Sequence, residues 1–182
     1  MLVIMGKKVY LREFSKDNLT DPKYFSWLRD LDVVTNICRL EYLLPLQFEE
    51  VENYVYSLLE SNTDCFFAIY YKENDVFIGT LRIGHIVWRT GIGDIGILIG
   101  NKDYWGKGLS KDSIRAACTY AFNDLSLRKL TAGTPVINIP MCKCFERIGF
   151  KQEGQIREQS LINGKYVDHI LFGLFRNEFV EK

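Results

Sequence analysis

The chain has 182 residues, and its 23 basic and 23 acidic side chains give a formal net charge of zero. This length fits one domain with a substantial core, which we expect to span residues 1–182. Zero net charge argues against a nucleic-acid-binding protein, because such proteins usually carry a basic excess or a basic face. Small anionic ligands need only local positive charge, so they are not excluded.

The cysteines and the N-terminus indicate the cellular environment. The five cysteines are odd in number and form no C-x-x-C pair, which predicts neither a disulfide framework nor a zinc site. Only five apolar residues precede "GKK" at the start, too few for a signal-peptide core or a membrane span. We therefore expect a cytoplasmic protein with no membrane partner.

The first half of the chain predicts a strand, two helices and an antiparallel meander. Residues 8–14 have strand composition, and residues 17–31 and 45–61 carry apolar side chains at helical spacing. Three further strands are expected over residues 65–71, 76–89 and 92–99, and polar turns separate them.

The second half predicts a helix over residues 109–122, a strand over 128–136, a helix over 138–150 and a C-terminal hairpin. Asn163 and Gly164 mark the hairpin turn. The expected fold is α+β, with a mixed, mostly antiparallel sheet of about seven strands and about four helices.

Two glycine signatures compete for a phosphate site. Gly91, Gly93 and Gly96 match G-x-G-x-x-G, but a strand follows them, whereas a dinucleotide site requires a helix there. Gly106 and Gly108 follow a strand and open a helix, where free N–H groups and the helix dipole bind anions. A Walker-type loop is excluded, because five residues rather than four separate Gly100 from Gly106.

Two motifs resemble the GNAT superfamily of acetyl-CoA-dependent N-acetyltransferases. Residues 105–110 read W-G-K-G-L-S, similar to the family's pyrophosphate loop R/Q-x-x-G-x-G/A, with Trp first and Ser last. Asn138, Glu146, Arg147, Gly149 and Phe150 match the motif N-x-x-S/A-x-x-x-Y/L-E-K-x-G-F. A Trp at the first position of this loop, as at Trp105, resembles the branch of the family that contains ribosomal-protein alanine acetyltransferases. The resemblance extends over nearly the whole chain.

The resemblance implies acetyl-CoA as the cofactor and assigns residues to it. The backbone of Ile97, Leu98 and Ile99 would pair with the pantetheine arm, and an N–H near Leu98 would polarise the thioester carbonyl. The pyrophosphate and its neighbouring phosphate would lie against a further set: Trp105, Gly106, Lys107, Gly108, Leu109, Ser110, Asn138 and Lys143. Lys102, Lys111 and Arg147 are additional candidate cations.

The acceptor amine must lose a proton, since an alkyl ammonium has a pKa near ~10. Asp94 is the first candidate base, because it precedes "IG" where this branch commonly carries Glu. Glu41, His85, Glu158 and Asp168 are reserves. The family's usual acid is a Tyr seven residues after the motif Asn, and Phe145 stands there, so that role does not transfer. Cys142 and Cys144 are weak substitutes.

The acceptor pocket is expected at the link between the first two helices, at Trp88 and at the final hairpin. Arg39, Glu41, Tyr42, Trp88 and Glu158 are the candidate substrate residues. A small-molecule amine, an amino sugar and a peptide N-terminus all remain open. Two rival hypotheses also remain, a non-catalytic acyl-CoA-binding sensor and a dimeric interaction module, and a homodimer is compatible with all of them.

Overall fold

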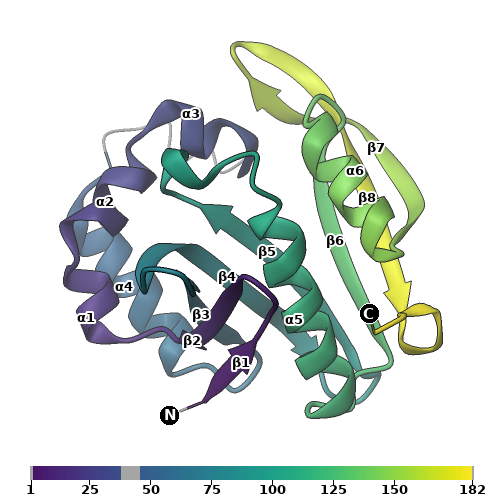
Figure 1. The fold of residues 1–182 in the computed structure, drawn as a ribbon. Coiled ribbons are helices and arrows are strands. Elements are labelled where there is room, and N and C mark those ends of the chain that lie inside the picture. Colours follow the sequence, from purple (N-terminus) through teal and green to yellow (C-terminus); the bar gives the residue numbers. More distant parts are fainter. Residues whose placement is uncertain (1, 38–45, 182) are drawn as a thin grey trace.

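The computed structural model describes residues 2–37 and 46–181, which form one mixed sheet between two helical layers (Figure 1). The strands are β1 (Val3–Met5), β2 (Val9–Glu13), β3 (Cys65–Tyr71), β4 (Val76–Val87), β5 (Ile92–Ile99), β6 (Lys129–Pro135), β7 (Lys151–Ile162) and β8 (Lys165–Phe175). The α-helices are α1 (Lys16–Thr20), α2 (Pro22–Leu28), α3 (Leu31–Val34), α4 (Phe48–Leu59), α5 (Leu109–Asn123) and α6 (Ile139–Ile148). Short 3-10 helices are η1 (Thr35–Ile37), η3 (Lys102–Tyr104) and η4 (Arg176–Glu178).

The strand order is β1-β2-β3-β4-β5-β6-β8-β7. Adjacent strands are antiparallel except β5 and β6, which are parallel and are connected through α5. The expected α+β fold with a mixed, mostly antiparallel sheet is confirmed. The sheet has eight strands rather than about seven, because Val3–Met5 pairs with β2.

The helix expected over residues 17–31 is divided into three short helices. α1 ends at Thr20 because the residue before a proline disfavours helical geometry, and Asp21 precedes Pro22. The Asp21 carboxylate then caps α2 by accepting the Lys23 N–H at 2.9 Å. Asp30 caps α3 in the same way. These breaks account for the larger number of helices.

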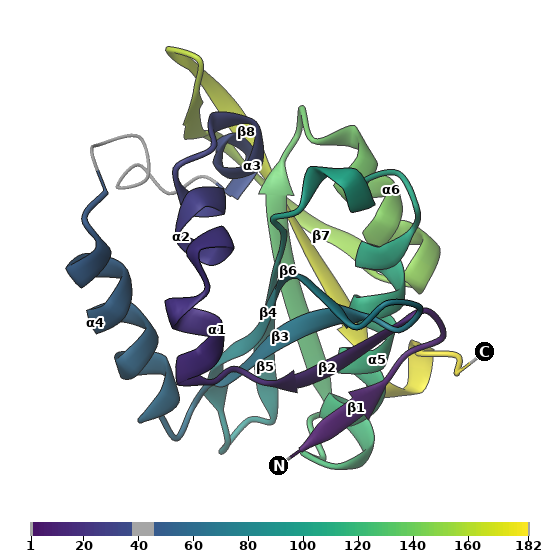
Figure 2. The same cartoon turned by 60° about the vertical axis from the view of Figure 1, so that its left-hand side comes forward.

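The two faces of the sheet are covered by different helices. α5 and α6 lie on one face, and α1, α2 and α4 lie on the other (Figure 2). The predicted apolar stripe of α5 is buried on the first face, at Ile114, Ala117, Cys118, Ala121 and Phe122. The second face has its own core, in which Trp27 packs against Phe77.

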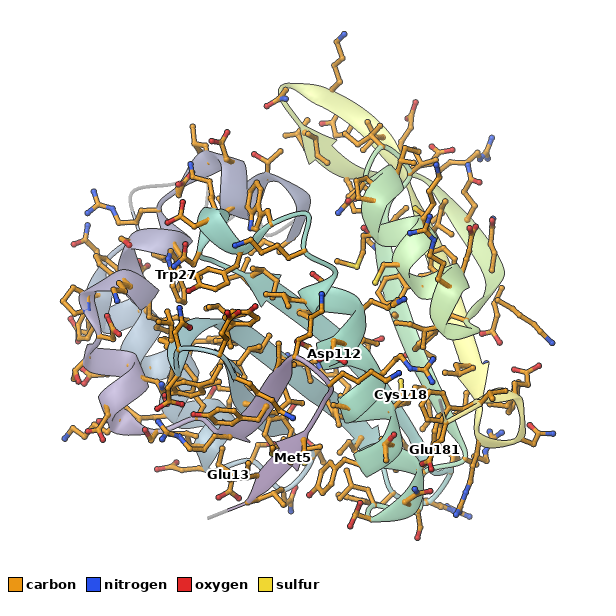
Figure 3. The ribbon with its side chains drawn as sticks, in the orientation of Figure 1. Met5, Glu13, Trp27, Asp112, Cys118 and Glu181 are labelled. Carbon is orange, nitrogen blue, oxygen red and sulfur yellow. The ribbon has the colours of Figure 1, made fainter. Side chains whose placement is uncertain are left out.

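Asp112, in the first turn of α5, holds the turn between β1 and β2 (Figure 3). Its carboxylate accepts the backbone N–H groups of Lys7 at 3.0 Å, Lys8 at 2.7 Å and Val9 at 3.0 Å. Gly6 permits the close approach, because a Cβ there would lie 2.8 Å from a carboxylate oxygen. This contact fixes the start of α5, and with it the glycine loop that precedes the helix.

Removing this carboxylate should destabilise the fold. We expect Asp112→Ala to lower the free energy of unfolding by about 2 kcal/mol, because hydrogen bonds to charged groups are lost. Urea unfolding measures the change. The control is Asp124→Ala at the exposed C-terminal end of the same helix, where no side-chain hydrogen bond is lost. Equal stabilities of the two variants would contradict a stabilising role for the Asp112 hydrogen bonds.

Candidate functional site

The parallel pairing of β5 with β6 stops before either strand ends. The last paired residues are Ile95 and Ala132, although β5 continues to Ile99 and β6 to Pro135. Beyond that point the two strands diverge (Figure 1). The next ladder bond, from the Ile97 N–H to the Gly133 carbonyl, is not part of this pairing. The bond after it would need an N–H on Pro135, which proline lacks.

The backbone groups that face this split follow from the strand register. The Gly100 N–H donates to the Ile78 carbonyl at 2.9 Å, so every second residue of β5 turns its peptide groups towards β4. Leu98 is one of these residues, and Ile97 and Ile99 are not. The N–H and C=O of Ile97 and the N–H of Ile99 therefore point into the split, where they lack a strand partner.

The expectation of an oxyanion donor at Leu98 is therefore corrected. Its N–H faces Thr80 on β4, with which it is in register. Ile97 carries the N–H that faces the split. The Ile99 carbonyl is also occupied, because it accepts the Trp105 indole N–H at 2.8 Å. Trp105 thus fastens the glycine loop to the end of β5.

The loop before α5 has the geometry expected for an anion site. Gly106 and Gly108 have φ values of +73° and +75°, and a Cβ at either would meet no atom within 4 Å. Across residues 2–37 and 46–181, no acceptor is found for the backbone N–H groups from Gly106 to Lys111. Leu109 is buried, so only its backbone is offered there. Open space and free donors at a helix start suit a pyrophosphate.

The candidate cations differ in their surroundings. Lys102 is paired with Asp30 at 2.7 Å and with Asp32 at 3.0 Å, so it anchors α3 instead of facing the loop. The Lys107 ammonium lies 4.8 Å from the centre of the Tyr104 ring. Lys143 is exposed on α6. Asn138 caps α6 by accepting the Met141 N–H at 3.3 Å.

The position of the family's usual acid is apolar. Phe145 is buried, and its ring centre lies 5.2 Å from that of Phe150 and 5.3 Å from that of Phe172. Burial raises the pKa of the Cys142 thiol and raises the pKa of Cys144 to about 11. Both thiols are therefore protonated at neutral pH.

Asp94 lies beside the split, on the face of the sheet opposite to the one that α5 covers. Its carboxylate accepts the Thr131 hydroxyl at 2.6 Å. Burial raises the pKa of Asp94, and the Thr131 hydrogen bond and nearby positive charge oppose the rise. Gly96 and Gly133 are the exposed glycines on this face, and a Cβ at Gly96 would meet no atom within 4 Å. The Asp94 carboxylate thus lies beside open space over Gly96.

His169 joins this face, although the sequence did not point to it. Its Nδ1 lies 3.1 Å from the Ser160 hydroxyl, and its Nε2 lies 2.5 Å from the point that a Cβ on Gly133 would occupy. Burial lowers the pKa of His169, and Asp94 acts in the opposite direction. The alternation of side chains along β8 determines the face of the sheet on which His169 lies. Only the pairing of β8 with β6 brings His169 to the split.

The remaining substrate candidates are dispersed. Trp88 lies in the β4–β5 turn, before the start of β5, whereas the split lies at the end of β5. Its indole N–H donates to the Asn62 carbonyl at 2.8 Å. Its expected place in the pocket is therefore wrong. Glu158 is exposed in a bulge of β7, and its N–H donates to Asp168 at 2.9 Å. The remaining candidates, Arg39, Glu41 and Tyr42, lie outside the described residues.

Two further features concern residues 2–37 and 46–181. These residues contain no group of three or more His, Cys, Asp or Glu side chains arranged to hold a metal ion. No helix among them is long and apolar enough to cross a membrane.

Comparison with known proteins identifies the family. The sequence model of the acetyltransferase (GNAT) domain matches residues 8–151. The chain belongs to the GNAT acetyltransferase family. The uncharacterized N-acetyltransferase p20 of Bacillus licheniformis is 30% identical over 113 residues, which cover 62% of this chain and 63% of that protein. The probable N-acetyltransferase YjcK of Bacillus subtilis is 32% identical over 114 residues, or 61% of each chain. These GNAT relatives are thus matched over less than two thirds of their length.

A longer match and a solved structure extend the GNAT likeness. The spermidine N(1)-acetyltransferase of Vibrio cholerae is 27% identical over 165 residues, covering 90% of this chain and 91% of that protein. The crystal structure of the Vibrio cholerae spermidine N-acetyltransferase in complex with CoA and spermine has a TM-score of 0.84 at 21% identity. That alignment covers 96% of this chain and 99% of the other, and it shows the same fold.

The half-buried Asp94 should lower stability at neutral pH. Its pKa in the folded state lies above the ordinary value of 3.8, so the folded state binds the proton more tightly. This contribution to stability is complete below pH 3.8 and is lost as the pH rises through the raised pKa. We expect Asp94→Asn to be more stable than the wild type at pH 7, with a smaller gain at pH 4, in urea unfolding. A variant destabilised equally at both pH values would contradict this.

Proposed function

We propose that the chain transfers an acetyl group from acetyl-CoA to a primary amine, by direct attack of the amine in a ternary complex. Membership of the GNAT family supports the reaction class, and the split between β5 and β6 beside the glycine loop carries the assignment to this site. Acetyl-CoA, when bound, supplies an activated acetyl thioester. The side chains and peptide groups of the chain must bind the cofactor, polarise the thioester carbonyl and help the ammonium lose its proton.

The donor half of the site fits the chemistry of coenzyme A. The free N–H groups from Gly106 to Lys111 suit the doubly charged pyrophosphate, with Lys107 and Lys143 as candidate cations. A pantetheine arm carries amide groups that can pair with Ile97 and Ile99 as a strand would. In this arrangement the Ile97 N–H is the donor that polarises the thioester carbonyl.

The acceptor half lies on the face of Asp94. Gly96 leaves room over the sheet beside the split, and the carboxylate attracts an ammonium group. We retain Asp94 as the group on which loss of the ammonium proton depends, as expected from the sequence. No acid is assigned at Phe145. A thiolate is an adequate leaving group, because thiols have a pKa near ~8.5.

Polyamines come first among the acceptors to be tested. The relative from Vibrio cholerae is named as a spermidine acetyltransferase, and Asp94 provides a carboxylate for a small cationic amine. Amino sugars and N-terminal peptides complete the panel. The assay measures thiol release from acetyl-CoA together with the mass of the acetylated product. A cytoplasmic location and a homodimer, formed through the hairpin of β7 and β8 or through the edge of the meander, remain predictions, and sedimentation tests the dimer.

A non-catalytic acyl-CoA sensor is the second candidate, favoured by the apolar environment of Phe145. The same panel separates the two functions. Saturable acetyl-CoA binding without product on any amine would favour the sensor over the enzyme.

The glycine loop is tested with a matched pair of variants. Gly108→Glu introduces a side chain at φ +75° and a negative charge among the free N–H groups, whereas Gly164→Glu introduces the same side chain at φ +73° in the β7–β8 turn. We expect Gly108→Glu to weaken CoA affinity by about 100-fold, roughly 3 kcal/mol, because the phosphates are repelled. Calorimetry should find unchanged affinity in Gly164→Glu. Equal affinities would remove the loop from the cofactor site.

The dependence on Asp94 is tested by Asp94→Asn. We expect kcat/KM for the amine to fall by about 100-fold at pH 7, because deprotonation of the ammonium is impaired. Affinity for CoA should not change, because Asp94 lies on the opposite face of the sheet from the glycine loop. Thiol-release kinetics and calorimetry measure the two effects. Full activity of the variant would exclude Asp94.

A further inference from the structure

His169 lies nearer to the split than Asp94 does. Asp94 is in register with Thr131, where β5 and β6 are still paired. Gly133 is two residues further along β6, which is ~7 Å along a strand. The His169 Nε2 lies over Gly133, at the level where the two strands separate. An amine that attacks a carbonyl held at Ile97 would therefore meet this nitrogen before it met the Asp94 carboxylate.

The hydrogen bond between His169 and Ser160 uses Nδ1 of the ring and not Nε2. Ser160 is buried, and a bulge in β7 sets it opposite Val167, so that its hydroxyl meets Nδ1 at 3.1 Å. In the tautomer whose Nδ1–H donates to Ser160, the lone pair of the ring is on Nε2. Within residues 2–37 and 46–181, Nε2 has no hydrogen-bond partner. Burial lowers the pKa of His169, so the ring is neutral at pH 7.

The charges around the ring favour its protonation at the moment of reaction. Asp94 interacts electrostatically with His169 from β5, and Arg82 and His85 act on Asp94 from β4. The Arg82 guanidinium is already paired with Asp64 at 2.5 Å. Asp168 is adjacent in β8, but its carboxylate accepts the Gln155 amide and the Glu158 N–H. Asp94 is therefore the negative charge that an imidazolium at His169 would meet.

We propose that His169 is a further catalytic residue, whose Nε2 takes the proton from the acceptor ammonium while the Asp94 carboxylate stabilises the resulting imidazolium. The inference rests on the proposed acetyl transfer. An ammonium N–H bond breaks, an Nε2–H bond forms, and the freed lone pair of the amine attacks the thioester carbonyl. The C–S bond then breaks, and the proton lost as the nitrogen becomes an amide neutralises the thiolate. The imidazolium releases its proton to solvent.

The first test compares the pH dependence of kcat/KM in His169→Gln and Asp94→Asn. His169→Gln should lose about 100-fold at pH 7, together with the acidic limb that reports the base. Asp94→Asn should retain that limb at a lower pH, because the imidazolium loses its stabilising charge. Both variants should bind CoA with the affinity of the wild type. Imidazole added to His169→Ala should restore activity, whereas imidazole added to Asp94→Asn should not.

The second test needs no acyl donor. The chain has two histidines, so NMR can follow both imidazoles, and His85→Gln assigns them. The pKa of His169 should fall in Asp94→Asn and change in Ser160→Ala. A His169 pKa that is unaffected by Asp94→Asn would overturn the coupling.

The outcomes separate this inference from the proposed function. Wild-type kcat/KM and an unchanged acidic limb in His169→Gln, with activity lost in Asp94→Asn, would overturn the role of His169. Asp94 would then be the direct base, and acetyl transfer would stand. A wild-type chain that acetylates no amine, although it binds acetyl-CoA, would overturn both.

Discussion

The end of the β5–β6 ladder, beyond which Pro135 offers no N–H to the Ile97 carbonyl, is the constraint from which the site follows. A parallel ladder needs alternate donors from both strands, and β6 cannot supply the donor that the Ile97 carbonyl requires. The two strands continue on separate courses, each held by its outer neighbour, β5 by β4 and β6 by β8. An opening in the middle of a sheet, with unpaired peptide groups along one edge, is the result. An extended amide-containing ligand satisfies these groups as the missing strand would.

The end of β5 is held from several directions, which keeps the donor groups in place. The Trp105 indole bonds to the Ile99 carbonyl and connects the strand to the glycine loop. The Trp27 ring of α2 packs against Gly100, where any Cβ would overlap the ring. Asp112 attaches the first turn of α5 to the turn between β1 and β2. The free N–H groups of the loop and the open edge of β5 are thereby fixed relative to each other, so little ordering remains when a ligand binds.

Local patterns were sufficient for much of the fold and less so for the site. The stripe of α5, the meander of β3, β4 and β5, and the Asn163–Gly164 turn depend on residues close in sequence, and each is found. The breaks at Asp21 and at Asp30 redirected a segment that its spacing assigned to one helix. The choice between Ile97 and Leu98 depends on a register of one residue, which composition does not determine. His169 reaches the split only because β8 lies beside β6 and not beside β5, a crossover that no local pattern specifies.

The acid–base properties of Asp94 and His169 support their joint use. Burial raises the pKa of the carboxyl group and lowers the pKa of the imidazole, so the two proton affinities move towards each other. A base works best when its pKa lies near the operating pH, and a histidine whose pKa is lowered stays neutral until an ammonium arrives. A carboxylate at the same atom would be the weaker base, because even a raised Asp pKa starts from 3.8. Its better use is as a fixed negative charge behind the ring, which attracts the ammonium and then stabilises the imidazolium that replaces it.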